Sequence, residues 1–286
     1  MGIQFWLIQA FNGISYGALL FLLASGLSLI FGVMRIVNLS HGSYFLLGGY
    51  VALSVIAVTG SWWLALPVAA LTIAAVGLVM ERVFLRPLGF DPLRQVLLTV
   101  GFAFLFQQAA LDIWGGDPMT IDPPAVLDGS IVVGGIYLPI YRIFMISTAV
   151  LMGLGLWLAM EKTRMGAMVR AAVDDAEMAR GVGINTSRVS MFIFALGAFL
   201  AALGGAIGGA FFGVYPGLDF EVLPLAFAVV IIGGMGSLAG AAMGSLMVGL
   251  ADNFGKALFP EVSYFTLYAP MVLILALKPT GLFGRD

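Results

Sequence analysis

The chain has 286 residues, of which 61% are hydrophobic and 10% are charged, and its formal net charge is −2. Soluble domains contain about 45–50% apolar and about 25% charged residues, so this composition indicates a protein that resides in a lipid bilayer. The chain has no cysteine, which excludes disulfides, thiolate metal sites and cysteine nucleophiles. Its charge balance gives no support for nucleic-acid binding.

Apolar runs that could cross a membrane recur along the whole chain. A hydrocarbon core of about 30 Å requires about 20 apolar residues in a helix. We predict spans near residues 5–33, 43–58, 62–80, 95–113, 142–160, 189–212, 222–235, 237–252 and 263–278. The count is eight or nine, because residues 222–252 form either one broken passage or two. The predicted fold class is an all-α, polytopic transmembrane helix bundle in a single integral-membrane domain, residues 1–286.

The stretch NLSHGS, residues 38–43, places polar, helix-breaking residues between the first two runs. It contains the one histidine of the chain. A metal site or a proton relay needs partners, and the chain has no second His and no Cys, so we predict no metal site, and catalysis is the least favoured role. Two other roles stay open, a polar cap at a helix end near the cytoplasm and a lining of the translocation pathway. The candidate residues are Asn38, Ser40, His41 and Gly42.

Charges in the connecting segments predict the orientation, because Lys and Arg gather on the cytoplasmic side. The basic segments are 81–94, with Arg82, Arg86 and Arg94, and 161–188, with Lys162, Arg164, Arg170, Arg180 and Arg188. The loop 114–141, with the adjoining Asp112, has acids and no base, so it is predicted to be periplasmic. Its Pro- and Gly-rich sequence predicts either a short hairpin over the pore or a plain connector. Lys278 and Arg285 place the C-terminus in the cytoplasm, and the N-terminus lies outside with nine passages and inside with eight or ten.

The segment 161–188 contains an alanine-rich stretch that predicts a short amphipathic helix over Arg170–Arg180, which ends at the following Gly-Val-Gly. Small side chains on one face suggest a knob that fits a groove in a soluble partner. The alternative is a positively charged anchor that only sets topology. The candidate coupling residues are Arg170, Ala171, Asp174, Asp175, Ala176, Ala179, Gly181, Gly183 and Asn185.

The run 189–212 carries small residues every four positions, in one row of glycine and alanine from Gly197 to Gly213 and a second row from Ala198 to Ala210. Such rows let helices approach closely, either within the chain or between subunits. A second polar, glycine-rich break follows at GGMGSLAG, residues 233–240, with Gly233, Gly234 and Gly236 as candidate pathway or break residues. Paired breaks in two halves predict broken helices and an internal inverted repeat of the kind found in transporters. No strand precedes this glycine run, so it is not a dinucleotide fingerprint.

Several stretches together resemble one family. They are RIVNLSHGSYFLLGGYVA, ERVFLRPL, RAAVDDAEMARGVGINTSRVSMFIFALGAFLAALGGAIGG, IIGGMGSLAGAAMG and KPTGLFG. These motifs resemble the LivH-type permeases of branched-chain amino acid ABC importers, and the similarity spans nearly the whole chain. Urea and short-amide importers have nearly the same motifs, so their cargo is the alternative to leucine, isoleucine or valine.

The resemblance implies a multi-pass permease of the bacterial inner membrane that binds no cofactor and is not an enzyme. The implied partners are a second, LivM-like permease, two cytoplasmic ATP-binding subunits that use ATP and Mg, and a periplasmic substrate-binding protein. Residues 161–188 would be the cytoplasmic coupling loop. The sequence contains no Walker A motif, so ATP hydrolysis is expected in the partners. Whether the two permeases are identical stays open. The rivals from other classes are an ion-coupled secondary transporter and a membrane-embedded enzyme.

Overall fold

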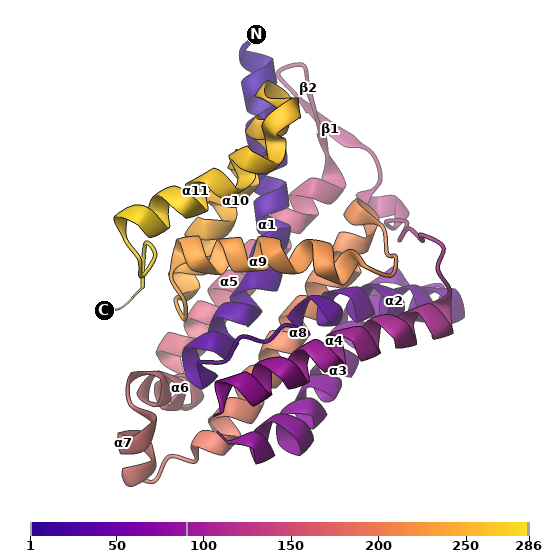
Figure 1. Cartoon of the computed structure of the whole chain (residues 1–286). Helices are drawn as coiled ribbons and strands as arrows, with labels where there is room; N and C mark the ends of the chain where they lie inside the picture. The colour runs from indigo at the N-terminus through magenta and orange to yellow at the C-terminus, as the bar shows by residue number, and fades with distance from the viewer. Residues whose placement is uncertain (1, 90, 285–286) are drawn as a thin grey trace.

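A computed structural model describes residues 2–89 and 91–284, and it is a bundle of helices with one small hairpin (Figure 1). Six helices are long and apolar enough to span a membrane: α1 (Ile3–Met34), α2 (His41–Thr59), α3 (Trp62–Val79, extended to Leu88 by a π-helical turn, Met80–Leu85, and a 3-10 turn), α4 (Pro92–Trp114), α5 (Ile140–Lys162) and α8 (Thr186–Phe212). The all-α polytopic bundle is therefore confirmed.

The predicted break in residues 222–252 is also confirmed. Helices α9 (Leu218–Gly233) and α10 (Leu238–Leu258) meet at a bend of 119°, and the last helix, α11 (Ser263–Leu277), is shorter than the others. Counting the bent pair as one span gives seven spans by length and composition, close to the eight or nine predicted. The count is lower than predicted because residues 222–252 form this bent pair and because α11, with 15 residues, is short for a bilayer of about 30 Å.

Helices α1 and α8 form the centre of the bundle, and their small residues explain why. The Cβ that a side chain would add at Gly26 of α1 lies 3.0 Å from the Cα of Gly197 in α8, so the two backbones are in direct contact. At Gly205 an added Cβ would strike the carbonyl oxygen of Phe45 in α2. Both rows of small residues on α8 therefore serve packing within the chain.

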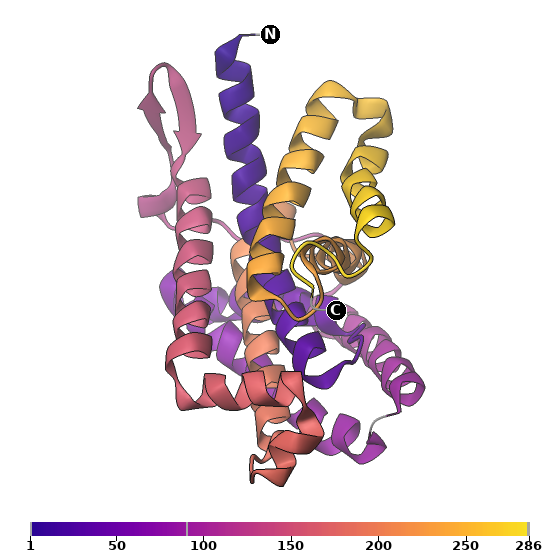
Figure 2. The same cartoon turned by 90° about the vertical axis from the view of Figure 1, so that its left-hand side faces the viewer.

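The loop after α4 forms the predicted hairpin. Strands β1 (Ser130–Val133) and β2 (Ile136–Pro139) pair antiparallel around Gly134 and Gly135, whose φ values of 58° and 79° suit a tight hairpin turn. Figures 1 and 2 show the hairpin beside the N-terminus, at the end of the bundle opposite to the segment after α5. The N-terminus thus shares a side with the hairpin, as the four spans α1 to α4 between them require.

The prediction of a single helix over Arg170–Arg180, in the segment after α5, is wrong. This segment forms two helices, α6 (Arg164–Asp174) and α7 (Ala176–Gly181), and we call it, up to the first turn of α8, the elbow (residues 164–188). The chain is extended at Asp175, with φ −153° and ψ 101°. The Asp175 carboxylate accepts hydrogen bonds from the amides of Glu177 and Met178 and so caps a new helix, which competes with continuation of the first.

Opposite placement of the hairpin and the elbow predicts a labelling pattern. A cysteine at the exposed Ser130 of the hairpin should react with a membrane-impermeant thiol reagent added to the periplasmic side, and one at the exposed Glu177 should react only after the membrane is opened. The chain has no native cysteine to interfere. The reverse pattern would show that the orientation is inverted. The cytoplasmic C-terminus stays a prediction, and Arg285 lies outside the described residues.

Candidate functional site

The first break, residues 35–40, is held by its own polar side chains, and Asn38 and Ser40 within it are buried. Helix α1 ends at Arg35 in the left-handed conformation, with φ 54°. The Asn38 side-chain oxygen then accepts from the amide and the hydroxyl of Ser40, at 3.1 and 2.7 Å. The amide of Leu39 donates to the hydroxyl of Thr99 in α4 at 3.2 Å. The irregular backbone predicted at NLSHGS is therefore present and shielded from lipid, as a membrane interior requires.

His41 begins α2 and is fully buried. Its Nε2 donates to the carbonyl oxygen of Leu23 in α1 at 2.9 Å, and its Nδ1 has no hydrogen-bond partner among the described residues. Its ring meets the ring of Tyr44 edge to face at 6.0 Å. The side chain thus joins two helices and does not cap α2, which makes a structural role the one that the geometry favours.

The start of α2 is bound to the start of α9 through a residue that the sequence analysis missed. The Ser43 hydroxyl donates to Oδ2 of Asp219 at 2.9 Å, although the two residues are 176 positions apart. Asp219 is 2% exposed, and its Oδ1 has no partner among the described residues. At Gly42 an added Cβ would strike the carbonyl oxygen of Asp219, so close approach is the reason for glycine there.

The second break, residues 234–237, packs on the end of α1. Gly234 and Gly236 have φ values of 99° and 82°, which only glycine adopts readily. An added Cβ at Gly32 would lie 2.9 Å from the Cα of Gly236. The C-terminal segment covers the break, because the amides of Leu282 and Phe283 donate to the carbonyl oxygens of Ile232 and Gly233, both at 2.9 Å. The second break therefore contacts α1, the helix that precedes the first break.

The elbow is fixed to the bundle by its inner face. Val169 and Ala172 of α6 and Ala179 of α7 are buried. Arg170 donates to the carbonyl oxygen of Met160 at the end of α5, and its guanidinium lies 3.8 Å from the carboxylate of Glu161. Ala179 was predicted to face a partner protein, and this is wrong, because the break at Asp175 turns Ala179 inward.

Two apolar side chains occupy the outer face of the elbow instead. Met178 is 66% exposed and Val182 is 71% exposed. Among the predicted coupling residues, Asp174, Asp175, Gly181, Gly183 and Asn185 are exposed, while Ala171 and Ala176 are partly buried. Gly183, with φ 89°, turns the chain sharply after α7 as predicted. Sequence reasoning favoured the alanines, and it overlooked Met178 and Val182, the two larger apolar residues near them.

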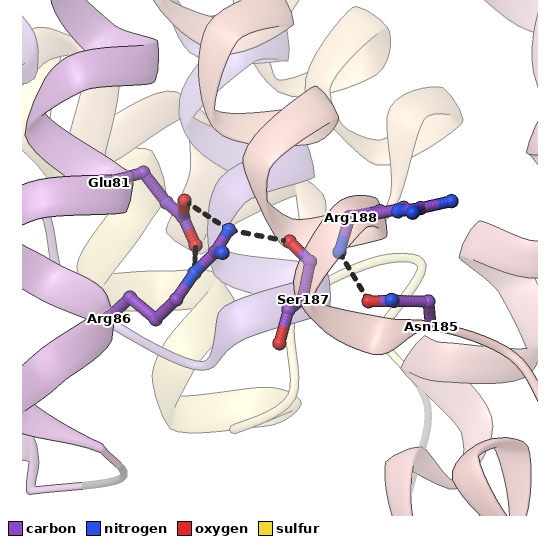
Figure 3. Close-up of polar contacts among 5 residues, drawn as sticks. All are labelled: Glu81, Arg86, Asn185, Ser187 and Arg188. Atoms are coloured by element: carbon purple, nitrogen blue, oxygen red, sulfur yellow. Dashed lines mark hydrogen bonds and ion pairs between the residues drawn. The ribbon is translucent and has the colours of Figure 1, made fainter.

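A brace connects the elbow to the segment that follows α3 (Figure 3). The guanidinium of Arg86 forms a salt bridge with Glu81 at 2.9 Å, and its Nη2 also donates to the carbonyl oxygen of Ser187 at 3.1 Å. Asn185 caps α8 by accepting from the amide of Arg188 at 3.0 Å. The buried carboxylate of Glu81 thus orients Arg86 toward the first turn of α8, so this arginine joins the segment after α3 to α8.

Removal of the brace should loosen the start of α8. A hydrogen bond to a charged group contributes about 1.5–3 kcal/mol, and tenfold in an equilibrium is about 1.4 kcal/mol. Arg86→Ala is therefore expected to speed hydrogen–deuterium exchange of amides 185–190 by roughly tenfold. Arg82→Ala, which removes an exposed arginine four positions earlier, is the matched control and should leave exchange unchanged. Equal exchange in both variants would show that Arg86 does not hold the elbow.

Comparisons with known proteins give consistent results. The family model described as branched-chain amino acid transport system, permease component, matches residues 9–275. The permease protein LivH of the high-affinity branched-chain amino acid transport system of Escherichia coli is 31% identical over 98% of this chain and 96% of its own length. The corresponding protein BraD of Pseudomonas aeruginosa is 29% identical over 99% and 97%. The ribose import permease RbsC of Haemophilus influenzae is 26% identical over 84% and 74%. No solved structure matches.

Proposed function

The chain belongs to the family of branched-chain amino acid transport permease components, and on that premise we propose that it is the transmembrane subunit of a binding-protein-dependent ABC importer. The cargo is leucine, isoleucine or valine, and the site of action is the bacterial inner membrane, with the C-terminus in the cytoplasm. The observation that carries the proposal is similarity over almost the full length to permeases named for branched-chain amino acids.

The partners follow from this proposal. A second, LivM-like permease completes the membrane part, a periplasmic binding protein delivers cargo on the hairpin side, and two cytoplasmic subunits hydrolyse ATP with Mg. The elbow couples this chain to one of them. Met178 and Val182 are well placed to enter a groove, and Arg170, Arg86 and the cap at Asn185 hold the elbow to α5, α3 and α8.

Cargo moves by alternating access, which needs elements that can shift as units. The first break gives α2 a defined start inside the bundle and the second gives α9 a defined end, and the Ser43–Asp219 bond joins the start of α2 to the start of α9. Half-helix N-termini at such breaks can face a carboxylate, while unwound carbonyl groups can face an ammonium. An ATP-driven change at the elbow would reach the breaks through α8 and α1, the two central helices.

Urea and short amides are the alternative cargo, and a competition assay separates them from branched-chain amino acids. Proteoliposomes containing the complete importer should take up labelled leucine, and unlabelled isoleucine and valine should reduce this uptake. Urea, acetamide and ribose, each at a 100-fold excess, should leave it unchanged. Uptake of labelled urea or acetamide without uptake of leucine would assign the chain to the other cargo class.

A further inference from the structure

A cavity of about 630 Å³ lies between α1, α9, α10 and α11 and has no role in the account so far. It sits in the half of the bundle toward the hairpin, because Phe254 of α10 contacts Trp6 near the start of α1, with ring centroids 5.7 Å apart. In Figure 2, α10 and α11 form an arch beside α1 at this end. Its volume falls within the roughly 300–1,000 Å³ typical of pockets for small molecules.

One wall of the cavity carries an ion pair. Asp252 of α10 is 4% exposed, and its Oδ2 accepts from Nζ of Lys256 at 2.7 Å. The Lys256 side chain is 62% exposed, and its Nζ lies 5.7 Å from the centre of the Tyr16 ring, which also lines the cavity. A lysine ammonium has three donors, so Lys256 retains donor capacity for a further acceptor.

A second carboxylate faces the same cavity. Glu221 lies in the first turn of α9 and accepts from the hydroxyl of Tyr215 at 2.8 Å. Burial, together with the neighbouring Glu221 carboxylate, raises the pKa of Tyr215 to about 12, so this hydroxyl stays a donor at neutral pH and fixes the Glu221 side chain. The remaining wall is apolar and includes Leu218, Val222 and Leu225.

Structural need alone does not account for these charges. A buried carboxylate such as that of Asp252 is costly inside a membrane protein, and its pairing with Lys256, whose side chain is 62% exposed, gives only modest stabilisation. The side chains of Glu221, Asp252 and Lys256 also line the cavity instead of packing in the core. A cavity with one cation, two anions and an aliphatic wall has the groups that recognise both ends of a zwitterion with an apolar side chain.

We infer that this cavity is a binding site for free α-amino acids, occupied during their passage from the hairpin side. The ammonium of the cargo contacts Glu221 and Asp252, its carboxylate contacts Lys256, and its aliphatic side chain packs on the wall of α9. This inference rests on the proposed function and deepens it. The far end of α9 is the second break, so the site lies between the hairpin side and the breaks.

Protection of a cysteine tests binding directly in the complete importer. Ser263 lines the cavity, and a cysteine placed there should react with a thiol reagent more slowly when leucine is present. Two analogues each lack one charged group: 4-methylpentanoate has no ammonium, and isopentylamine has no carboxylate. Each should need at least tenfold higher concentration for the same protection. A cysteine at Ser130 of the hairpin is the control and should show none. If leucine and both analogues protect equally, or if none of them protects, the cavity is not a binding site for amino acids.

Neutralising the ion pair separates binding from folding. The double variant Asp252→Asn, Lys256→Gln leaves neither member of the pair as an unpaired charge, so the complex should assemble in normal yield while leucine uptake falls at least tenfold. Glu261→Gln, an exposed acid nearby in the sequence, is the matched control and should transport normally. Normal uptake by the double variant contradicts the site. Absence of leucine uptake by the unchanged importer would instead contradict the proposed function.

Discussion

Replacing Met178 and Val182 together by aspartate is expected to release the ATP-binding subunits and to abolish ATP hydrolysis stimulated by cargo. Both side chains project from the elbow and are 66% and 71% exposed. Complete burial of such a side chain contributes about 1.5–3 kcal/mol. Even with incomplete burial in a groove, the loss of both should cost about 3 kcal/mol, which corresponds to about a 100-fold weaker association.

Two controls restrict the interpretation of this experiment. Glu177→Gln changes only an exposed charge on the same helix, and exposed ion pairs contribute about 0–1 kcal/mol, so association should persist. Val132→Asp places the same new charge on the hairpin, at the opposite end of the bundle, and should also have no effect. Co-purification of the ATP-binding subunits measures the outcome. If the double variant retains the subunits and the stimulated hydrolysis, the elbow only sets topology.

Gly42→Val is expected to abolish transport, whereas His41→Gln should retain most of it. At Gly42 an added Cβ would strike the backbone carbonyl of Asp219 and would lie 3.1 Å from Cβ of Leu223, so α2 and α9 would have to separate. Overpacking of this kind typically costs about 1–3 kcal/mol, and here it also disrupts the Ser43–Asp219 bond. Glutamine at 41 retains an N–H donor for the carbonyl of Leu23, so the loss should be about 1 kcal/mol.

Gly101→Val is the matched control for the glycine substitution. No atom lies within 4 Å of a Cβ at Gly101 in α4, so valine there should be tolerated. Uptake and the yield of assembled complex should be measured together for all three variants. Complete loss of uptake by a normally assembled His41→Gln importer would contradict the structural role of His41 and would support a proton relay.

Local signals in the sequence predicted the features that depend on nearby residues. Polar and glycine residues predicted the breaks at 35–40 and 234–237, because such residues interrupt a helix between two apolar runs. The Pro- and Gly-rich loop favoured turns and left open a hairpin or a plain connector, and the structure has the hairpin, with Gly134 and Gly135 in its turn. The rows of small residues on α8 predicted close helix packing, and the structure assigned that packing to α1, α2 and α3.

Other features depend on contacts between distant residues or on competition between similar local structures. The Ser43–Asp219 bond joins two segments whose packing no periodicity reveals. The cavity beside Asp252 and Lys256 also has walls from α1 and α11, which lie far from α10 or beyond a turn in the sequence. The helix break at Asp175 was missed because an aspartate can either continue a helix or cap a new one, and the two outcomes differ by only about 1 kcal/mol. That break alone reversed the expected exposure of Ala179.

The energy source of leucine uptake tests the central claim most directly. Proteoliposomes should contain this chain with its second permease and its ATP-binding subunits, with the binding protein outside and either ATP or ADP in the lumen. The account predicts that labelled leucine accumulates only with ATP inside and that ionophores, which dissipate ion gradients, leave the rate unchanged. Leucine uptake that proceeds with ADP inside, follows an imposed ion gradient and stops when ionophores are added would show that the chain is an ion-coupled carrier, contrary to the account.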